Sequence, residues 1–504
     1  MKIRPQIISL TLLVVSLISC TKSPPQLQQQ SLELATFSQS IQQMEIEWNP
    51  NDPRSGQERM QALHDFFTET YDGIETFSIP QEMLIGNRLT RSIWNYDQVF
   101  GRDIGLVMWP QNRDVPVYGV SAARNPTSGQ IAFTNNCLMC HMAEIDGTVY
   151  FGVGTKIFDE KRLVEVAIES TSPVARRMLR LPPETDQQMQ YVHQTLKRQQ
   201  HQKTDPLTRG SFTSLVRSHV ELYRSANQGE SPPVKAVRRG DGKTPPLWHY
   251  VAKQPFGRWY LDGSLHGEHP LMASSMELPK GRTFTDLRQI AIPTIIKQFE
   301  SVIAQIRPPT YPDHINSELA QKGKQLFYSK QIGCSKCHGV YDGRGNVDWT
   351  GAHIDVGTDP ARRNIVSNAF IQAFSQSPLA DQLSLVKSRG YAATPLTGVW
   401  ANFPYLHNGS VPTLYHLLGP VEDRPQIFFT YGALYLDKQK VGQHLYPKHF
   451  KRTQQTDDLI GKYGQDRDWY NVNRTGADNS GHDFWPLIKT NQNRLALIEY
   501  LKTL

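Results

Sequence analysis

The pentapeptide Cys-x-x-Cys-His occurs twice in this chain, at residues 137–141 and 334–338. This spacing is typical of covalent haem attachment, because the two thiols add to the two vinyl groups of one porphyrin and the histidine binds the iron. The two motifs use four of the five cysteines. We therefore expect two covalently bound haem c groups, which are held by Cys137, Cys140, His141, Cys334, Cys337 and His338.

Three other uses of paired cysteines stay open at this point. A zinc site can be built from the same four thiols, but its two halves usually lie closer in sequence. A thioredoxin-like redox pair does not require the trailing histidine and would follow a βαβ pattern. Structural disulfides give no reason for a histidine after both pairs. Covalent haem is the interpretation that accounts for both histidines.

The N-terminal residues predict export. Residues 1–19 have the pattern of a signal peptide, with Lys2 and Arg4 before an apolar run that is too short to span a membrane stably. The residues up to Cys20 resemble a bacterial lipobox, which makes Cys20 the predicted lipidation site; an ordinary signal followed by a chance cysteine is the alternative. Residues 20–32 then form a polar, lipid-anchored linker. We expect a periplasmic protein that the lipid alone anchors, with the outer membrane favoured.

Length and charge narrow the possible partners. A chain of 504 residues allows two or three domains. Its formal charge of +7 would fall with four haem propionates, so we expect no nucleic-acid binding. Basic residues between 176 and 203 are most simply a solvated helical face, but they could steer an acidic redox partner such as a small cytochrome or a cupredoxin.

The approaches to the two motifs suggest a weak internal repeat. Gly129 and Phe133 precede the first motif, and Gly323 and Phe327 precede the second; each pair is predicted to lie on a short helix that crosses a later helix closely. Residues 494–504 are predicted as the last helix. We expect a mainly α fold with two cytochrome c-like haem domains and long loops. The predicted domains are residues 33–310, with a helical insert at about 158–226, and residues 311–504.

The second axial ligand of each iron is less constrained. No methionine occurs after Met276, so a six-coordinate C-terminal haem most simply takes a second histidine. The candidates are His353, His407, His416, His444, His449 and His482. Among them His482 is favoured over His407, because it lies in a flexible loop just before the last helix. For the N-terminal haem, an open iron is as plausible as ligation by one of Met139, Met142, His249, His266 and His269.

Several segments together resemble a known superfamily. Residues 394–400 and 405–414 look like the C-terminal signature of the bacterial dihaem cytochrome c peroxidase superfamily. Residues 357–362 and the Gly-His loop at His482 are more similar to its rubber-oxygenase branch, and residues 244–248 are similar to the segment that places an aromatic between the haems there. The resemblance covers roughly residues 115–504, apart from the insert.

The resemblance implies roles for individual residues. His141 and His338 would be the proximal ligands, His482 the distal ligand of the second haem, and Trp248 the bridge between the haems. Phe256 or Tyr260 would lie near the open face of the first haem. The superfamily implies one electron-transfer haem and one haem at which oxygen or peroxide reacts. The chain departs from the peroxidases because no methionine follows the His407 motif, and it is shorter than expected for a rubber oxygenase.

These observations leave three classes of function. The first is a dihaem oxidoreductase with peroxide or oxygen chemistry at the N-terminal haem. The second is a lipid-anchored electron carrier in which both irons are closed. The third is a lipoprotein that senses a gas or a redox state through haem. An aromatic residue between the haems favours the enzyme, although a buried structural tryptophan is the commoner role of such a residue.

Overall fold

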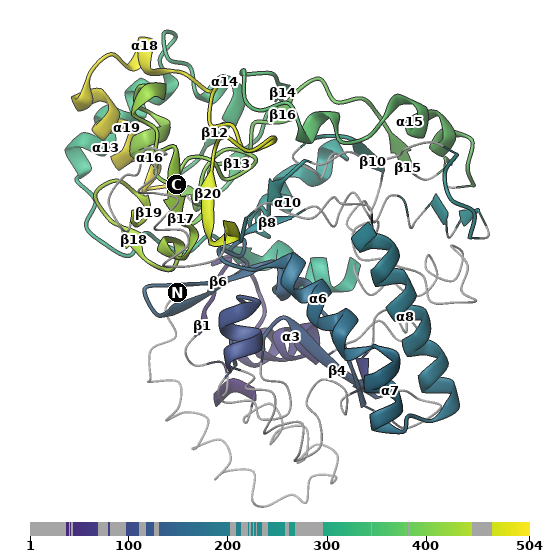
Figure 1. The fold of residues 1–504 in the computed structure, drawn as a ribbon. Coiled ribbons are helices and arrows are strands. Elements are labelled where there is room, and N and C mark those ends of the chain that lie inside the picture. Colours follow the sequence, from purple (N-terminus) through teal and green to yellow (C-terminus); the bar gives the residue numbers. More distant parts are fainter. Residues whose placement is uncertain are drawn as a thin grey trace, which may run out of the picture.

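A computed structural model of the chain describes most residues from 37 to 504 (Figure 1). The described ranges, which include short gaps, are 37–68, 79–80, 97–109, 117–124, 131–201, 208–212, 220–233, 240–257, 262–267, 296–445 and 466–504. The predicted signal peptide, the linker and Cys20 lie outside these ranges. Within them, no helix combines the length and the apolar character that a membrane span requires.

Helices form the longest elements and strands are short. The helices are α3 (Gly56–Thr68), α6 (Glu160–Ser170), α7 (Pro173–Leu179), α8 (Pro183–His201), α10 (His249–Lys253), α13 (Ser317–Tyr328), α14 (Ser335–His338), α15 (Asn368–Ser375), α16 (Leu414–Leu417), α18 (Trp485–Ile488) and α19 (Asn491–Leu501). The strands of the N-terminal half are β1 (Met44–Glu45), β2 (Glu47–Trp48), β3 (Ile79–Pro80), β4 (Val120–Arg124), β5 (Ile131–Asn135), β6 (Met142–Ile145), β7 (Thr148–Phe151), β8 (Ser211–Phe212), β9 (Gly242–Lys243), β10 (Leu265–Gly267) and β11 (Ile306–Arg307). Those of the C-terminal half are β12 (Val340–Tyr341), β13 (Val347–Asp348), β14 (His353–Ile354), β15 (Leu383–Leu385), β16 (Tyr391–Ala392), β17 (Ile427–Phe429), β18 (Leu436–Asp437), β19 (Gly442–Gln443) and β20 (Trp469–Asn471).

The approach to the first haem motif is a strand, so its predicted helix is wrong. Phe133 lies in β5, which pairs antiparallel with both β3 and β4. The run Ile-Ala-Phe-Thr-Asn is rich in β-branched and aromatic residues, which favour a paired strand once neighbouring strands are present. The motif itself begins with the 3₁₀ turn η2 (Cys137–Met139), and the hairpin of β6 and β7 follows it.

Helices α6, α7 and α8 occupy residues 160–201, inside the range of the predicted helical insert. Each of its first two helices begins at a side-chain cap: Asp159 accepts from the Arg162 N–H before α6, and Ser172 accepts from the Ala175 N–H before α7. The apolar side of α8 packs onto α6 through Met189, Val192 and Leu196. These three helices form a separate group at the lower right of Figure 1.

The close helix crossing predicted for the second motif is confirmed. Helices α13 and α19 pack together, and a Cβ atom at Gly323 would lie only 1.9 Å from the carbonyl oxygen of Ala496. Phe327 contacts Tyr500 on the partner helix, with ring centroids 5.2 Å apart. The last helix begins at Asn491, three residues before the predicted start.

The two halves of the chain are joined by pairing and by buried charge. Strand β10 pairs with β15, and the buried Arg362 and Asp262 form an ion pair at 2.9 Å. The main hydrophobic core also contains side chains from both halves. The mainly α fold with two cytochrome c-like domains and a boundary near residue 310 stays a prediction.

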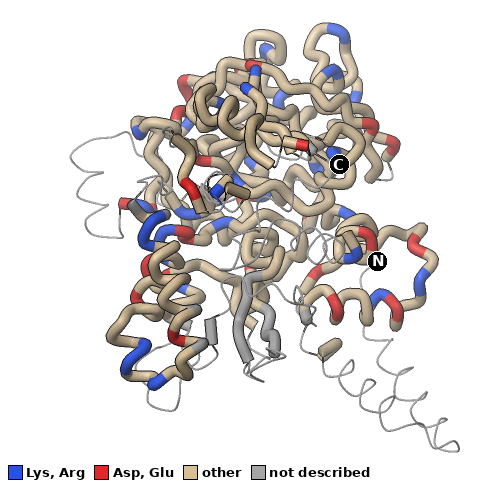
Figure 2. The backbone as a smooth tube through the Cα atoms, turned by 90° about the vertical axis from the view of Figure 1, so that its right-hand side faces the viewer, with Lys and Arg blue, Asp and Glu red and all other residues tan. Residues whose placement is uncertain are grey.

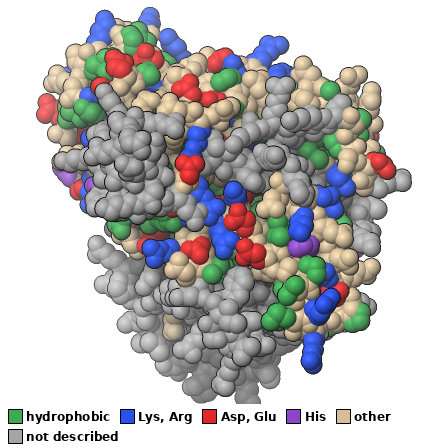
Figure 3. All heavy atoms as spheres, viewed as in Figure 1, with side chains coloured by type: hydrophobic (Ala, Val, Ile, Leu, Met, Phe, Trp, Pro, Cys, Tyr) green, Lys and Arg blue, Asp and Glu red, His purple; other side chains and the backbone are tan. Residues whose placement is uncertain are grey.

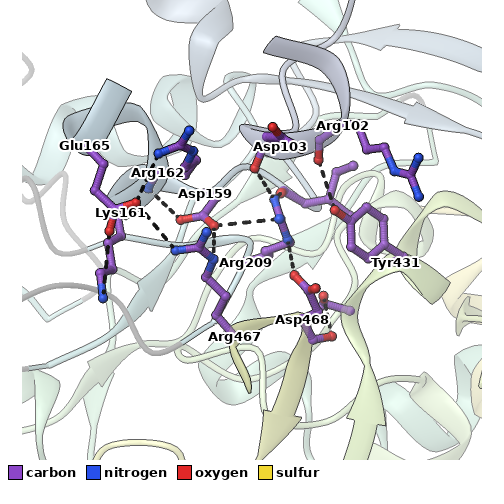
Figure 4. A network of polar contacts seen from close by, with 12 residues as sticks. Arg102, Asp103, Asp159, Lys161, Arg162, Glu165, Arg209, Tyr431, Arg467 and Asp468 are labelled. Atoms are coloured by element: carbon purple, nitrogen blue, oxygen red, sulfur yellow. Dashed lines mark hydrogen bonds and ion pairs between the residues drawn. The ribbon is translucent and has the colours of Figure 1, made fainter. Parts of the chain in front are cut away.

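A second buried network joins the helical insert to the C-terminal half (Figure 4). Arg209 contacts Asp468 at 2.6 Å, and Arg467 contacts Asp159 at 2.7 Å. The Arg209 guanidinium also lies over the ring of Tyr431. Losing one member of such a buried ion pair is strongly destabilising, because the other charge stays behind without a partner. The network therefore helps to fix the insert against the C-terminal half.

Charges of both signs are spread over the surface. Figure 2 shows Lys and Arg interspersed with Asp and Glu along the backbone, and Figure 3 shows basic and acidic side chains next to one another near the middle of one face. Within the predicted basic face, Arg176 forms an ion pair with Asp186 at 2.7 Å. Part of that face is therefore neutralised, and the steering of an acidic partner stays a prediction.

Candidate haem-binding sites

The second motif presents a histidine that is oriented for iron. His338 is at the end of α14, and its Nδ1–H donates to the Thr394 carbonyl at 2.8 Å. Such a second hydrogen bond fixes the tautomer of a metal-binding histidine and leaves Nε2 as the ligand atom. Burial lowers the pKa of His338, which favours the neutral ring that binds metals.

The ring of His482 faces this histidine. The two ring centroids are 6.2 Å apart, with an angle of 64° between the ring planes. One metal ion between two imidazoles needs a centroid separation of about 6 Å, because each metal–nitrogen bond is about 2 Å. Burial lowers the pKa of His482 to about 3, and its Nδ1 has no hydrogen-bond partner among the described residues. This pair fits a haem iron between the rings.

Two glycine loops and an arginine hold His482 in place. His482 has a φ of +48°, in the left-handed region, and its N–H donates to the Val356 carbonyl at 2.8 Å. Gly481 approaches Gly357 so closely that a Cβ atom at 481 would lie 2.3 Å from the Gly357 carbonyl carbon. The buried Arg424 donates to the Gly481 carbonyl at 2.8 Å. The loops at 357 and 481 are thus packed backbone to backbone.

The other histidines predicted as possible ligands lie elsewhere. His407 is buried and stacks on Tyr391, with ring centroids 3.7 Å apart. His353 contacts the Gly351 carbonyl, and His416 contacts the Thr413 hydroxyl. His444 makes backbone hydrogen bonds to Gly432 and Tyr435, and His449 lies outside the described residues. The structure brings His482, rather than His407, to the His338 ring.

The first motif presents a similar buried histidine. Burial lowers the pKa of His141 to about 4, and the charge of Lys253 acts in the same direction. The nearby Pro245 carbonyl raises the pKa of His141 and so offsets part of this lowering. The Nδ1 atom of His141 makes no hydrogen bond of good geometry to any described group. A Thr-Pro pair lies near each histidine, but His338 binds the carbonyl of Thr394, whereas the carbonyl near His141 belongs to Pro245. The ring of Tyr250 packs edge-on against His141.

Among the described residues, no predicted sixth ligand contacts the His141 ring. Met142 is buried in β6, and Met139 packs into a small neighbouring core. The Nε2 of His249 lies 3.0 Å from the Thr397 carbonyl, and His266 contacts the Gly263 carbonyl. His269 lies outside the described residues. Among the described residues, the ring contact of His141 is with Tyr250, which is neither a histidine nor a methionine.

Trp248 lies between the two motif segments. Its indole N–H donates to the Thr397 carbonyl at 2.8 Å, three residues after the carbonyl that binds His338. On its other side the indole ring packs against Gly152, and a Cβ atom at this glycine would lie 3.3 Å from the ring. The Gly152 N–H in turn donates to the His141 carbonyl. A buried indole thus lies between Gly152, whose N–H binds the His141 carbonyl, and Thr397, three residues after the carbonyl that binds His338. Its role as a bridge stays a prediction.

Phe256 and Tyr260 are the two remaining aromatic residues predicted to lie near the first haem. Phe256 is partly exposed, and its ring packs against Trp349 and over Gly351, which follow the second motif. Its predicted position near the first haem therefore gains no support from these contacts. Tyr260 lies outside the described residues.

Lys253 is a buried cation near the first site that the sequence did not lead us to expect. Lys253, at the end of α10, is fully buried, and burial lowers its pKa to about 8. Its Nζ lies 5.6 Å from the centroid of the Tyr250 ring. The helix is only five residues long, so no periodic pattern marks this lysine as buried.

The four motif cysteines suit haem attachment better than a shared zinc site. All four are free thiols, as addition to a porphyrin requires. Burial raises the pKa of Cys137 to about 11. Among the described residues, no three His, Cys, Asp or Glu side chains are grouped as a metal site needs, so the two pairs do not meet around one zinc ion.

Comparison with known proteins connects the C-terminal half to a family. The family model described as RoxA-like, cytochrome c-like matches residues 390–429. This segment contains the Thr394 carbonyl that orients His338, the Thr397 carbonyl that accepts from Trp248, and His407.

Two curated relatives come from Sinorhizobium fredii (strain NBRC 101917 / NGR234). The uncharacterized protein y4iM is 31% identical over 236 residues, which are 39% of this chain and 51% of the relative. The uncharacterized protein y4iJ is 34% identical over 154 residues, which are 29% of this chain and 21% of the relative. The matches thus span about half of the first relative and about a fifth of the second. The matched cytochrome c-like domain implies that this chain binds haem c, as c-type cytochromes do.

Proposed function

We propose that the protein is a dihaem c-type cytochrome oxidoreductase of the peroxidase superfamily, nearest to its rubber-oxygenase branch. Oxygen or peroxide would react at the N-terminal site, and the C-terminal site would transfer electrons. The observation that carries this proposal is an asymmetry: His338 faces a second histidine, whereas His141 faces none among the described residues. The matched RoxA-like domain supports the same branch.

The asymmetry gives the two sites different chemistry. When bound, haem supplies an iron that passes single electrons and that takes up oxygen or peroxide where a coordination position is open. His338 and His482 would both hold the second iron, and ligation by two histidines favours electron transfer at a low potential. His141 would hold the first iron from one side only.

Trp248 would connect the two sites. Its neighbours lead in one direction through Gly152 to His141, and in the other through Thr397 to the Thr394 carbonyl that orients His338. An aromatic ring at this position suits electron hopping between sites. The N-terminal residues favour an exported, lipid-anchored protein that receives electrons from a small cytochrome or a cupredoxin.

Ligand binding and turnover together test this function. The purified protein should bind cyanide or carbon monoxide at one iron and should turn over peroxide, or oxygen, with a reduced cytochrome as donor. Ligand binding without turnover would instead favour a sensor. If neither iron binds cyanide or carbon monoxide in either redox state, the protein is an electron carrier and the oxidoreductase proposal fails.

A further inference from the structure

A small cavity lies between segments from both halves of the chain. Residues 154–156 and 208–211 line one side of it, and residues 402–404 line another. The Thr155 N–H donates to the Cys140 carbonyl at 2.9 Å, so the wall is continuous with the first haem motif.

The buried Lys156 and the half-buried Lys243 bind one stretch of backbone in this wall. Lys156 donates to the carbonyls of Ala401 and Phe403, the second at 2.6 Å. Lys243 donates to the carbonyls of Asn402 and Pro404, the second at 2.7 Å. The lysines thus use alternate carbonyls of residues 401–404. An ammonium group has three N–H donors, so each lysine keeps one donor beyond these bonds.

The charge of these two lysines is not balanced within the described residues. Neither ammonium forms an ion pair there with an Asp or Glu side chain, and no Asp or Glu is among the described residues that line the cavity. The third cation of the wall, Arg209, is already paired with Asp468 in the network of Figure 4. Burial lowers the pKa of Lys156, and it lowers the pKa of Lys243 to about 7, because a charged ammonium group is unfavourable here. An anion between the two amino groups would stabilise their charged forms.

The rest of the wall suits an oxygen-rich ligand. Hydroxyl groups of Thr155 and Ser211 line the cavity and can donate to oxygen atoms, whereas the Thr430 hydroxyl already donates to the Asp468 carbonyl. The amide oxygen of Gln443, also in the wall, is buried without a partner among the described groups. A protonated phosphate or carboxylic oxygen, or a water beside the anion, would satisfy it.

We propose that this cavity binds an oxyanion of the phosphate or carboxylate class between the ammonium groups of Lys156 and Lys243. Charge-assisted hydrogen bonds from two ammonium groups are the strongest contacts available in the wall. Two sources can supply this chemistry: a free small anion, or the propionate carboxylate of a haem bound at one of the motifs.

Titration of the purified, haem-loaded protein with sodium phosphate tests the first source. A free-anion site predicts saturable binding by calorimetry and a rise in Tm, neither of which sodium chloride at equal ionic strength reproduces. Lys156→Met and Lys243→Met should each weaken binding by about tenfold or more, since each removes one partner of a buried charge pair. Lys161→Met is the matched control, because Lys161 is a partly exposed lysine of α6 outside the cavity, and it should leave binding unchanged.

Haem potentials test the second source. If a propionate fills the cavity, the wild type does not bind phosphate, and both Met variants lower the midpoint potential of one haem, because a nearby positive charge is lost. The control variant keeps the wild-type potential. If a Met variant is not recovered with haem, Lys156→Arg and Lys243→Arg replace it. These keep the charge but alter its geometry, so phosphate affinity or haem potential must change. Phosphate binding of equal strength in wild type and lysine variants overturns the proposal, as does the absence of both binding and potential shifts.

Discussion

The imidazole rings of His338 and His482 face each other with their centroids 6.2 Å apart, although 144 positions of sequence separate them. Neither ring pairs with a carboxylate among the described residues, and burial lowers the pKa of both. Two half-buried imidazoles whose lowered pKa favours the neutral form are suited, in this arrangement, to bind one metal ion from opposite sides. The closed C-terminal site rests on this relationship.

His482→Ala should convert one low-spin haem signal to high spin, because it removes the ring that faces His338. The measurement is electron paramagnetic resonance of the oxidised protein. His407→Ala is the control: its ring stacks on Tyr391 away from His338, so its loss should leave the spin state unchanged. A high-spin signal in His407→Ala alone would transfer the ligand role to His407.

Arg424→Met should loosen the loop that holds His482. The guanidinium donates to the carbonyls of Asn479 and Gly481, and a thioether cannot replace those bonds. We expect part of the C-terminal haem to become high spin and to bind cyanide. Lys438→Met is the control, since that lysine forms an exposed ion pair with Asp313, which is of little energetic value. If Arg424→Met unfolds the protein, Arg424→Lys keeps a donor and should show a smaller effect of the same kind. A fully low-spin haem in every Arg424 variant would mean that the loop holds without the arginine.

Gly323→Ala should lower the free energy of unfolding by about 1–3 kcal/mol, since the added methyl group overpacks the crossing of α13 and α19. The position has no room, with the Ala496 carbonyl oxygen 1.9 Å from an ideal Cβ. Urea unfolding of the haem-loaded protein measures the change. Gly56→Ala is the matched control, because nothing lies within 4 Å of a Cβ atom there. Equal stability of both variants and wild type would show that α13 and α19 adjust freely.

Trp248→Phe should slow electron transfer between the two sites and leave both haems bound. Phenylalanine keeps an aromatic ring but loses the hydrogen bond to the Thr397 carbonyl, and its ring is harder to oxidise. Stopped-flow reduction followed at each haem gives the rate. Trp109→Phe is the control, since Trp109 stacks on Tyr118 in the N-terminal core. An unchanged rate in Trp248→Phe would leave this tryptophan a purely structural role.

The sequence predicts most where the chemistry is local. The two Cys-x-x-Cys-His motifs are contiguous, and the spacing of Gly323 and Phe327 on one helix predicts its close crossing with α19. Phe133 was harder to place, because its strand depends on pairing with distant residues of β3 and β4. The same holds for Lys156, whose carbonyl partners lie about 245 positions away and leave no local pattern.

The electron paramagnetic and visible spectra of the purified, as-isolated protein test the central claim most directly, because they count the irons and their spin states. We predict two haems that stay with the protein on acid-acetone extraction, one low spin with two histidine ligands and one high spin that binds cyanide. Two low-spin irons that are both indifferent to cyanide, or a single haem per chain, would contradict the account.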